Sequence, residues 1–449
     1  MYKVEPEKLT FFEYDSISKI QDSSLKEFVN RELKKMLENS RLEIFTFDSQ
    51  GYIKFRQFVG LITLYDKNNN RHIYIEVLPK IYKYNSKVVT ARRILLKMLE
   101  KYLDVQFFKS SDRGKINLKN QNMFEIYVIL FLEYLKKLSL GLKRKYQFVE
   151  SNINTLKGRL LFAKHINKNL FNPTRFYTRH EEFTLDIPEN RILKTAITKM
   201  HRAYKNILSV EVEREFKKYL VLFSDVPESS NIHADLLKSN IDKTFIYYED
   251  AFKLAKLFLT QHTLINTLNE KYNKKNEEEV GLIFDMNLLF EKYVAKKLKE
   301  YLEPLKRKTE IEITEQESKH SIISDQSQSS GKNNSFKIVP DIVVRVKNNL
   351  YILDTKWKEI DLDKPNYNIS QQDLYQMLSY ASIYREAEKS QEISISIILI
   401  YPKTENFNSE LKFTFNDTNK TPLKIFPFDL FNPESSLKSL CNYLFDSSN

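Results

Sequence analysis

The chain has 449 residues, among which 71 basic and 59 acidic side chains give a formal net charge of +12. The length allows two or three domains, and the charge favours a polyanionic partner, although a composition rich in Lys and Asn would spread the same charge over every surface. The only cysteine, Cys441, excludes an internal disulfide and a cysteine-based zinc cluster and fits a reducing cytoplasm.

The first part of the chain is predicted to mix strands and helices. Residues 52–82 alternate aromatic and β-branched side chains around DKNNN, which predicts a hairpin with a polar turn. No segment has the pattern of a signal peptide, and the most apolar helix, 126–135, has about half the length of a membrane span. Periodic apolar residues predict helices at 90–103, 122–138, 211–224 and 246–268, and one that begins near Pro188.

Composition changes near residue 275, where the charged stretch LNEKYNKKNEEEV follows the last of these helices. We therefore expect an α+β N-terminal region over 1–275, β-rich over about 1–110 and mainly helical over about 111–275, and a second domain over 276–449. The order of elements in the second domain predicts an α/β fold with a mixed central sheet flanked by helices. Its helices are expected at 282–302 and 371–386, and its strands at 309–315, 338–346, 350–357, 392–400, 410–415 and 422–426.

Two carboxylates and one lysine are predicted to share a face of a hairpin formed by PDIVVRVKNNLYILDTKWK. Asn348 and Asn349 tolerate the left-handed backbone of a tight turn. With the turn at those residues, Asp341 faces Lys356 directly and Asp354 lies diagonally on the same face. One interpretation is a surface salt bridge worth roughly 0–1 kcal/mol. We favour a functional cluster, because both strands are strongly apolar and buried charges there need a partner or a metal.

The chemistry that suits this cluster is phosphodiester hydrolysis. Carboxylate oxygens from Asp341 and Asp354 are hard ligands of the kind that hold Mg²⁺ or Mn²⁺, and such a metal lowers the pKa of a bound water. Lys356 is placed to orient that water and to neutralise charge that develops on the phosphate. The pattern Pro340-Asp341, then twelve residues, then Asp354-Thr355-Lys356 resembles the signature of PD-(D/E)XK nucleases.

Two flanking features extend this resemblance. Gln376 and Tyr380 lie one helical turn apart and resemble the Gln-x-x-x-Tyr motif of several families in this nuclease group, although an aromatic stripe on a helix is more often core. In this position they are expected to contact the site or DNA. Glu291 lies at the edge of an apolar helix face, as a solvated acid or, as the resemblance implies for the first helix of the fold, as an outer metal ligand.

A closer resemblance covers about residues 55–381. The chain resembles McrC, the endonuclease subunit of McrBC-type restriction systems, in the blocks FRQFVGLITLYDKNNNRHIYIEVLPKI, LKGRLLFAKHI, EEFTLDIPENRILKTAI, FDMNLLFEKYV, IVPDIVV, LDTKWK and DLYQMLSYA. The resemblance implies an McrB-like AAA+ partner that reads modified cytosine in DNA and hydrolyses nucleotide, usually GTP, while the McrC-like subunit binds that ring, stimulates hydrolysis and cuts. No G-x-x-x-x-G-K-[ST] motif occurs in this sequence, in agreement with an NTPase on another chain.

The same resemblance implies that the N-terminal region docks the partner. The candidates for that contact are Glu182, Asp186, Asn190 and Arg191, since a cation presented in trans can stabilise the charge of phosphoryl transfer. The alternative is a capped helix start with a solvated Arg191. Residues 143–145 could follow a phosphate backbone, but a solvated charge run is the simpler interpretation.

The sequence therefore predicts a cytoplasmic, Mg²⁺-dependent endodeoxyribonuclease subunit of an NTP-dependent restriction system. Its expected partners are an McrB-like AAA+ ring, with GTP as the nucleotide, and double-stranded DNA that carries modified cytosine; no membrane is expected. One alternative is a non-catalytic assembly factor that activates an AAA+ ring. Another is a repair or recombination nuclease that acts without a partner.

Overall fold

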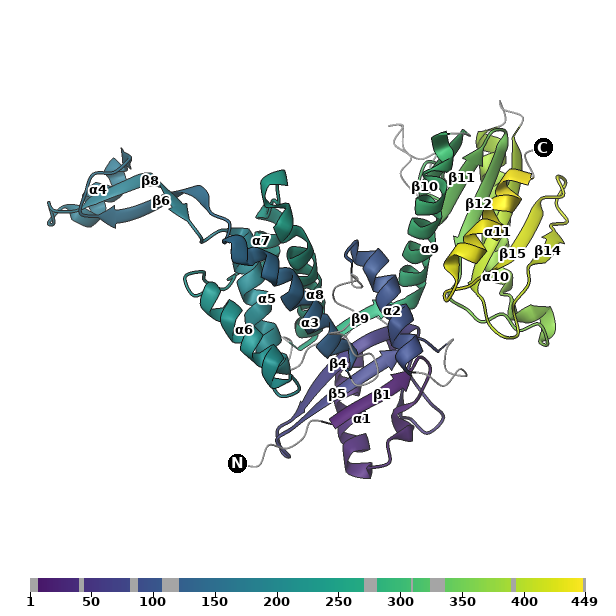
Figure 1. The fold of residues 1–449 in the computed structure, drawn as a ribbon, viewed down its shortest axis with the longest axis horizontal. Helices are drawn as coiled ribbons and strands as arrows, with labels where there is room; N and C mark the ends of the chain where they lie inside the picture. The colour runs from purple at the N-terminus through teal and green to yellow at the C-terminus, as the bar shows by residue number, and fades with distance from the viewer. Residues whose placement is uncertain are drawn as a thin grey trace.

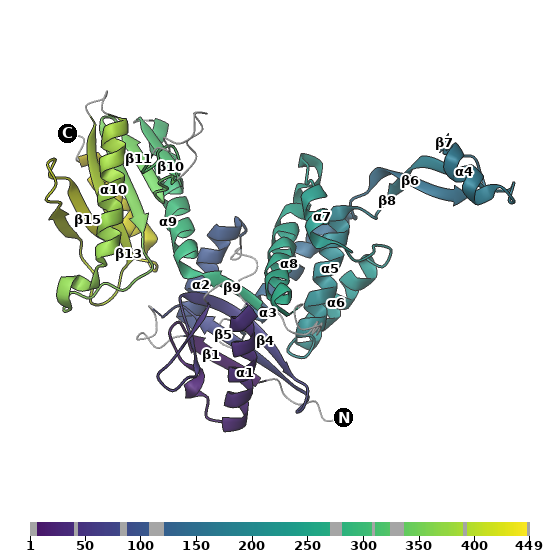
Figure 2. The same ribbon diagram turned by 180° about the vertical axis from the view of Figure 1, so that it is seen from behind.

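The computed structural model describes a chain in three parts: an N-terminal sheet with its helices, a helical bundle that carries a long projecting arm, and a C-terminal sheet (Figures 1 and 2). The charged stretch near residue 275, where the sequence predicts a domain boundary, lies outside the described residues. These are 7–39, 44–80, 88–106, 121–269, 281–307, 310–323, 336–388 and 393–446.

The N-terminal sheet contains the predicted hairpin, because β4 and β5 pair antiparallel on either side of the DKNNN turn. β1 adds in parallel to β5, and β9, from beyond the predicted boundary, adds antiparallel to β4. Gly60 permits this approach, since a Cβ there would lie 1.9 Å from the carbonyl oxygen of Leu282. In sheet order the strands are β1 (Glu7–Phe12), β5 (Arg71–Leu78), β4 (Phe58–Asp66) and β9 (Gly281–Asp285).

Helices cover both faces of this sheet. Apolar residues of α1 form one core with one face, and those of α2 and α3 form a larger core with the other. The predicted helices at 90–103 and 122–138 are confirmed as α2 and as α3 with η3, whereas α1 was not predicted. The elements are η1 (Ile17–Lys19), α1 (Ser23–Asn39), β2 (Phe45–Phe47), β3 (Ile53–Phe55), α2 (Val88–Leu103), α3 (Met123–Leu135) and η3 (Lys136–Leu140).

The helical bundle packs α3 against α5, α6 and α8, and its apolar residues continue the larger core of the sheet. α5 begins at Pro188, where proline fits the first turn because its missing N–H is not needed there. The predicted helices are confirmed, and α7 is an additional one. The elements are α5 (Pro188–Tyr204), α6 (Val210–Leu222), α7 (Ile232–Lys238), η4 (Lys243–Tyr248) and α8 (Glu249–Asn269).

The projecting arm interrupts the region that was expected to be mainly helical. It consists of the antiparallel strands β6 (Lys145–Ile153) and β8 (Phe176–Thr184), the short β7 (Arg159–Leu160) and α4 (Phe162–Asn169). The arm extends away from the bundle in both ribbon views (Figures 1 and 2). A strand is recognised in a sequence by alternating apolar and polar residues, and this alternation arises where one face of the sheet is buried. Most of β6 is exposed to some degree, so its sequence lacked that signal.

The C-terminal part is a mixed six-stranded sheet, which confirms the expected α/β arrangement. Its central strands β12 and β13 run parallel, and the outer pairs β10–β11, β11–β12 and β14–β15 run antiparallel. α9 and α11 pack on one face and α10 on the other (Figure 2). The strands in sheet order are β10 (Ile311–Glu315), β11 (Ile342–Val346), β12 (Asn349–Thr355), β13 (Ser394–Pro402), β15 (Pro422–Phe428) and β14 (Leu411–Thr414).

The predicted helix 282–302 is instead a strand followed by a helix. β9 ends at Asp285, whose side chain accepts a hydrogen bond from the backbone N of Asn287 and so caps α9. The chain thus passes from the first sheet to the second through α9 (Figure 1). Among the described helices none is long and apolar enough to cross a membrane. The remaining elements are α9 (Met286–Leu302), η6 (Leu305–Arg307), η7 (Pro365–Asn368), α10 (Gln371–Ala387) and α11 (Pro433–Asp446).

Candidate active site

The hairpin of β11 and β12 has a register two residues away from the predicted one. Val346 pairs with Asn349, so the turn consists of Lys347 and Asn348, and Lys347 adopts the left-handed backbone with φ of 51°. The predicted direct pairing of Asp341 with Lys356 is therefore wrong. β12 lies between β11 and β13, and burial in this sheet sets the register against the preference of the asparagines for the turn.

The corrected register brings the two aspartates closer together than predicted. Ile342 pairs with Leu353, so one further step along the hairpin places Asp341 opposite Asp354. Asp341 Oδ2 accepts hydrogen bonds from the backbone N of Thr355 at 2.7 Å and from its Oγ1 at 2.8 Å. Burial raises the pKa of Asp341 even though these two hydrogen bonds lower it. The carboxylate is thus held in place but remains unfavourable as a charged group.

Asp354 is the most deeply buried member of the site, with 2% of its surface exposed. Lys356 Nζ lies 2.6 Å from its Oδ2 in an ion pair. Burial, followed by repulsion from Asp341, raises the pKa of Asp354 to about 7 against the attraction of Lys356. The single ammonium of Lys356 therefore does not compensate the negative charge of both carboxylates.

Gln376 and Tyr380 hold Lys356 from α10. Lys356 Nζ donates to Gln376 Oε1 at 3.1 Å, and Gln376 Nε2 donates to the hydroxyl of Tyr380 at 2.8 Å. The Tyr380 hydroxyl in turn donates to the carbonyl oxygen of Val339 at 3.4 Å. Burial lowers the pKa of Lys356, but the combined attraction of Asp354, Asp373 and Asp341 outweighs it and the net shift is upward. The lysine is therefore an ammonium with a fixed direction.

Sequence reasoning missed two residues of this site. Asp373 accepts from Lys358 Nζ at 2.8 Å, and its charge acts on both Lys356 and Asp354. Its position three residues before Gln376, on the same helix face, is a signal that could have found it. Thr355 could not be found this way, because strand alternation places it on the face opposite Asp354 and Lys356.

Glu291 lies near the two aspartates but is not part of a compact ligand cluster. Gln316 Nε2 donates to Glu291 Oε1 at 2.8 Å, and Lys292 Nζ lies 3.8 Å from the same oxygen. Burial raises the pKa of Glu291, and the charge of Asp341 raises it further. Within the described ranges, no three His, Cys, Asp or Glu side chains are arranged to hold a metal ion by themselves.

The residues of the site nevertheless fit a divalent metal. Mg²⁺ in proteins is usually held by one or two carboxylates, with water and substrate phosphate completing its coordination. Asp341 and Asp354 supply those two carboxylates, and the buried Asp354 has the Lys356 ammonium as its ion-pair partner in the described part of the chain. The raised pKa of both groups shows that more positive charge would stabilise them.

Comparison with known proteins assigns the chain to a family. The family model described as "McrBC 5-methylcytosine restriction system component" matches residues 53–402. The chain belongs to this McrBC family. A comparison with curated proteins found no match.

Two solved structures resemble this McrBC-family chain. One is described as a refined half-complex from a tetradecameric assembly of Thermococcus gammatolerans McrB AAA+ hexamers with bound McrC; the matching chain has 18% identity and a TM-score of 0.64, over 97% of this chain and 100% of that one. The other, a cryo-EM structure of the Thermococcus gammatolerans McrBC complex, has 19% identity and a TM-score of 0.46, over 66% of this chain and 88% of that one. The first shows that the two chains share a fold.

The four predicted partner-contact residues lie at the foot of the arm in this McrBC-family protein, but not all are accessible. Glu182 and Asp186 have side chains that are 46% and 49% exposed. Arg191 is neither solvated nor free, since it forms ion pairs with Asp186 at 2.6 Å and with Asp235 at 2.7 Å. Asn190 is fully buried, so contact between its side chain and a partner is excluded in this conformation. Its amide is needed inside the chain to bridge two backbone carbonyls.

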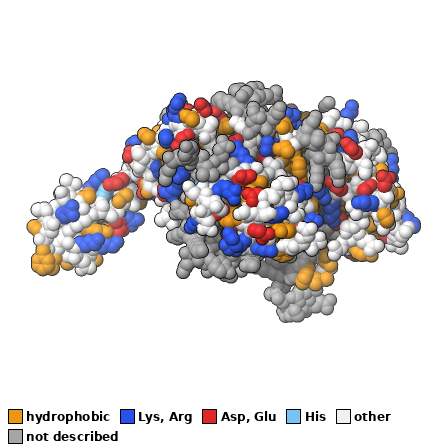
Figure 3. Space-filling view, turned by 90° about the horizontal axis from the view of Figure 1, so that it is seen from below, with side chains coloured by type: hydrophobic (Ala, Val, Ile, Leu, Met, Phe, Trp, Pro, Cys, Tyr) orange, Lys and Arg blue, Asp and Glu red, His pale blue; other side chains and the backbone are white. Residues whose placement is uncertain are grey.

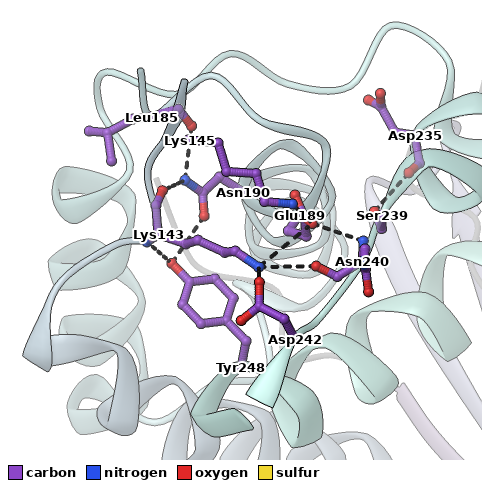
Figure 4. A network of polar contacts seen from close by, with 10 residues as sticks. All are labelled: Lys143, Lys145, Leu185, Glu189, Asn190, Asp235, Ser239, Asn240, Asp242 and Tyr248. Carbon is purple, nitrogen blue, oxygen red and sulfur yellow. Dashed lines mark hydrogen bonds and ion pairs between the residues drawn. The ribbon is translucent and has the colours of Figure 1, made fainter. Parts of the chain in front are cut away.

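Those carbonyls belong to a buried network at the base of the arm (Figure 4). Asn190 Nδ2 donates to the carbonyl oxygens of Lys143 and Leu185, both at 2.8 Å, and Tyr248 donates to Asn190 Oδ1 at 3.1 Å. Lys143 is 1% exposed. Both interpretations of residues 143–145 are therefore wrong for Lys143, because a buried side chain is neither solvated nor able to reach phosphate.

The charges of this network nearly balance. Lys143 Nζ lies 3.1 Å from Asp242 Oδ2 and 4.0 Å from Glu189 Oε1, and donates to the carbonyl oxygen of Asn240 at 3.0 Å. Lys145 Nζ lies 2.7 Å from the same Glu189 oxygen. We name this the arm-base network, and it consists of Lys143, Lys145, Glu189, Asn190, Asp242 and Tyr248. It joins the start of β6 to the start of α5 and so fixes the direction of the arm.

The arm itself exposes large apolar side chains. Phe171, in the turn after α4, is 95% exposed, and Figure 3 shows hydrophobic side chains gathered at the end of the arm. Single exposed apolar residues are ordinary, but a set on one small projecting element marks an interaction surface. We name this the arm surface. Its members are Tyr146, Phe148, Leu156, Phe162, Ile166, Leu170, Phe171 and Phe183.

Proposed function

We propose that this chain is the Mg²⁺-dependent endodeoxyribonuclease subunit of an NTP-dependent, McrBC-type restriction system, with a nuclease domain of the PD-(D/E)XK type. The observation that carries the proposal is the excess negative charge at the junction of β11 and β12, where Asp341 and Asp354 share one ammonium, that of Lys356. A hairpin that carries these residues inside a mixed sheet, preceded by α9 and followed by α10, agrees with the PD-(D/E)XK pattern.

Each residue has a distinct part in the proposed reaction. Asp341 and Asp354 would hold Mg²⁺ or Mn²⁺, which when bound polarises the phosphate and supplies a metal-bound water. Thr355 fixes the carboxylate of Asp341 through two hydrogen bonds. Lys356, aimed by Gln376, presents its ammonium to the attacking water and to the charge that develops on the phosphate.

Two more residues support the site from its edge. Tyr380 holds the amide of Gln376, and the amide of Gln376 sets the direction of Lys356. Glu291 adds negative charge beside Asp341, and we assign it as an outer metal ligand that acts through water. Gln316 holds Glu291 in place through its hydrogen bond to Oε1.

The partner that fits the rest of the chain is an McrB-like AAA+ ring that uses GTP and reads modified cytosine in double-stranded DNA. The similar solved structure contains McrB AAA+ hexamers with bound McrC. This sequence has no phosphate-binding motif of its own, so nucleotide hydrolysis falls to the partner. We place the ring on the arm surface, with Glu182 and Asp186 accessible at its foot, and the complex in the cytoplasm.

A cleavage assay tests the nuclease assignment. Plasmid with and without 5-methylcytosine is incubated with this protein, its ring partner, Mg²⁺ and GTP. Lys356→Ala is expected to reduce cutting of modified DNA by about a thousandfold, because the substitution removes charge stabilisation at the reacting phosphate. Lys412→Ala is the matched control, since Lys412 is 74% exposed on β14 of the same sheet and should cut as the wild type does.

The outcomes separate the three functions. Equal cutting by Lys356→Ala and wild type would make this chain a non-catalytic activator of the ring. Cutting of branched or unmodified DNA by this chain alone would favour a repair or recombination nuclease. Cutting that needs the ring, the modification and Lys356 supports the proposed subunit.

A second assay tests the arm surface. Phe171→Asp should abolish stimulation of GTP hydrolysis in the ring and leave the stability of this chain unchanged, because the side chain is almost fully exposed. Phe431→Asp is the matched control, since Phe431 is 52% exposed beyond β15 and away from the arm. Wild-type stimulation by Phe171→Asp would place the ring on another surface.

A further inference from the structure

A hydrogen bond beside the candidate active site joins two distant parts of the chain. Trp357, the only tryptophan, directly follows Lys356. Its indole Nε1 donates to Glu13, at 3.2 Å from Oε1 and 3.1 Å from Oε2. Glu13 follows β1 of the N-terminal sheet. The contact therefore links the first sheet to the segment that carries Lys356, and the proposed reaction does not yet use it.

Glu13 is an acid held inside the protein without a cation. Its surface is 1% exposed, and its Oε2 also accepts a hydrogen bond from the backbone N of Lys80 at 3.0 Å. In the described part of the chain no Lys or Arg side chain forms an ion pair with it, and the charges of Lys80 and Glu359 act from farther away. Burying a carboxyl in this way is costly unless hydrogen bonds compensate. Two donors, from Lys80 and Trp357, provide that compensation.

Trp357 is held on the side of its segment that faces away from α10. Lys356 and Lys358 both reach α10, at Gln376 and Asp373 respectively. Trp357 points to the other side, as alternation along an extended segment requires, and is 3% exposed. Its ring packs 5.4 Å from that of Phe290 on α9. The segment 356–358 is thus fixed from two sides, by α10 and by the pair Phe290 and Glu13.

We infer that Glu13 is a positioning residue for DNA cleavage, which receives the indole N–H of Trp357 and thereby fixes the ammonium of Lys356 beside Asp354. The inference rests on the proposed nuclease function. Through Glu13, the N-terminal sheet then contributes to the active site. Without Glu13, the indole of Trp357 is held by its apolar packing against residues such as Phe290. Loss of an outer contact of this kind costs about 10- to 100-fold in activity.

Three variants of the full chain test this, assayed with the ring partner, Mg²⁺, GTP and modified DNA. Glu13→Ala removes both acceptors, Glu13→Gln keeps one carbonyl acceptor, and Trp357→Phe keeps the ring packing without the donor. We expect kcat to fall about 10- to 100-fold in the alanine and phenylalanine variants and less in the glutamine variant. KM for DNA and stimulation of GTP hydrolysis should stay at wild-type values. The double variant should be no worse than the worse single one.

A structural readout accompanies the rates, because the single tryptophan reports on its own surroundings. In Glu13→Ala, the emission maximum of Trp357 should move to longer wavelength, and acrylamide should quench the indole more strongly. Both changes should be smaller in Glu13→Gln. The matched control is Glu76→Gln, a buried acid of the same sheet that pairs with Arg92 and makes no contact with the C-terminal sheet in the described residues. It should lose stability but keep the wild-type fluorescence and kcat.

The possible results are distinguishable. Wild-type kcat in Glu13→Ala and Trp357→Phe overturns the positioning role and leaves the nuclease assignment intact. Loss of kcat together with raised KM or lost stimulation of the ring indicates general unfolding and also overturns it. Absence of cutting by the wild type is a failure of the nuclease proposal itself, and the positioning role fails with it.

Discussion

A buried lysine, Lys143, and a half-buried one, Lys356, show how differently this protein uses internal charge. Lys143, at the base of the arm, lies against Asp242 and Glu189, and Lys145 shares the second of these acids. Two cations therefore meet two carboxylates. Lys356, in the C-terminal sheet, meets Asp354 directly, and Asp341, Asp373 and Glu291 also affect the charges of the site. Lys358 pairs with Asp373, and Lys292 lies 3.8 Å from Glu291, so three cations meet four carboxylates. The first group is near balance, whereas the second carries an excess of negative charge.

The difference separates a structural network from a binding site. In the arm-base network, two cations lie against two carboxylates, although Glu189 Oε2 has no hydrogen-bond partner in the described part of the chain, and the product is a fixed direction for the arm (Figure 4). In the candidate active site, the pKa of both aspartates is raised, which means that the folded chain alone does not stabilise their charges. Carboxylates with pKa values raised in this way are concentrated at functional sites, where a bound ligand can supply the positive charge that the chain lacks.

The largest expected effect comes from removing that excess charge. Asp354→Asn should abolish cleavage, with a loss of about a thousandfold, because one of the two proposed metal ligands is gone. Without metal, the free energy of unfolding should not fall and should rise above the wild-type value as pH increases, because burial and repulsion from Asp341 make the charged form of Asp354 unfavourable in the folded chain. Cleavage rates and denaturant unfolding of the same preparation measure both quantities.

A stability loss of several kcal/mol in Asp354→Asn would contradict the comparison, because it would make Asp354 a structural residue. The matched control is Asp363→Asn, an exposed acid in the loop after β12, which should alter neither cleavage nor stability.

How far the sequence could predict this site depends on which interactions carry the information. The shared face of Asp341, Asp354 and Lys356 was predictable because strand alternation is local and the strands are strongly apolar. The register was not, since burial between two neighbouring strands overrode the turn preference of Asn348 and Asn349. Gln376 and Tyr380 were found through helical spacing together with a family resemblance.

The parts that could not be predicted depend on contacts across long separations in the chain. Glu13 and Trp357 are 344 residues apart, and nothing in either local sequence indicates the other. Lys143 sits in a charged run that is typical of a solvated surface, and only the fold buries it against Asn240 and Asp242. Local patterns therefore predicted elements and faces, whereas the partners of buried charges required the three-dimensional structure.

The second prediction breaks the balanced network. Lys143→Met keeps the length of the side chain but leaves Glu189 and Asp242 short of one cation, which should cost about 3–5 kcal/mol of the free energy of unfolding. Arg144→Met is the matched control, because Arg144 is the exposed neighbour in the same run and should cost less than about 0.5 kcal/mol. Denaturant unfolding curves measure the difference. Equal stability of the two variants would mean that the network contributes nothing to the fold.

The third prediction concerns Glu13, an acid that forms no ion pair with a lysine or arginine among the described residues. Burial raises the pKa of Glu13 from 4.5 to about 7, even though hydrogen bonds from the backbone N of Lys80 and the indole of Trp357 lower it. Because the folded state binds this proton more tightly than the unfolded state, the stabilisation is complete below about pH 4.5 and is lost as pH rises through 7. The loss is on the order of 3 kcal/mol.

Unfolding measured between pH 4.5 and 8 tests this, with Glu13→Gln as the comparison, since its amide does not titrate. The stability of the wild type relative to that variant should fall over this interval. A constant difference between the two proteins would show that Glu13 keeps an ordinary pKa, and that its hydrogen bonds outweigh its burial.

The smallest effect is the response of stability to the metal itself. Mg²⁺ at 10 to 100 times its dissociation constant should stabilise the wild type by about 1–3 kcal/mol, since it binds the folded state alone. Lys143→Met should keep this increment because its defect lies in another part of the molecule, whereas Asp354→Asn should lose it.

The increment should also be smaller at pH 6 than at pH 8, because protons compete with the metal for Asp354, whose pKa burial raises to about 7. Thermal melts at the two pH values measure it, and an increment that is the same at both, or that survives in Asp354→Asn, would place the metal away from this carboxylate.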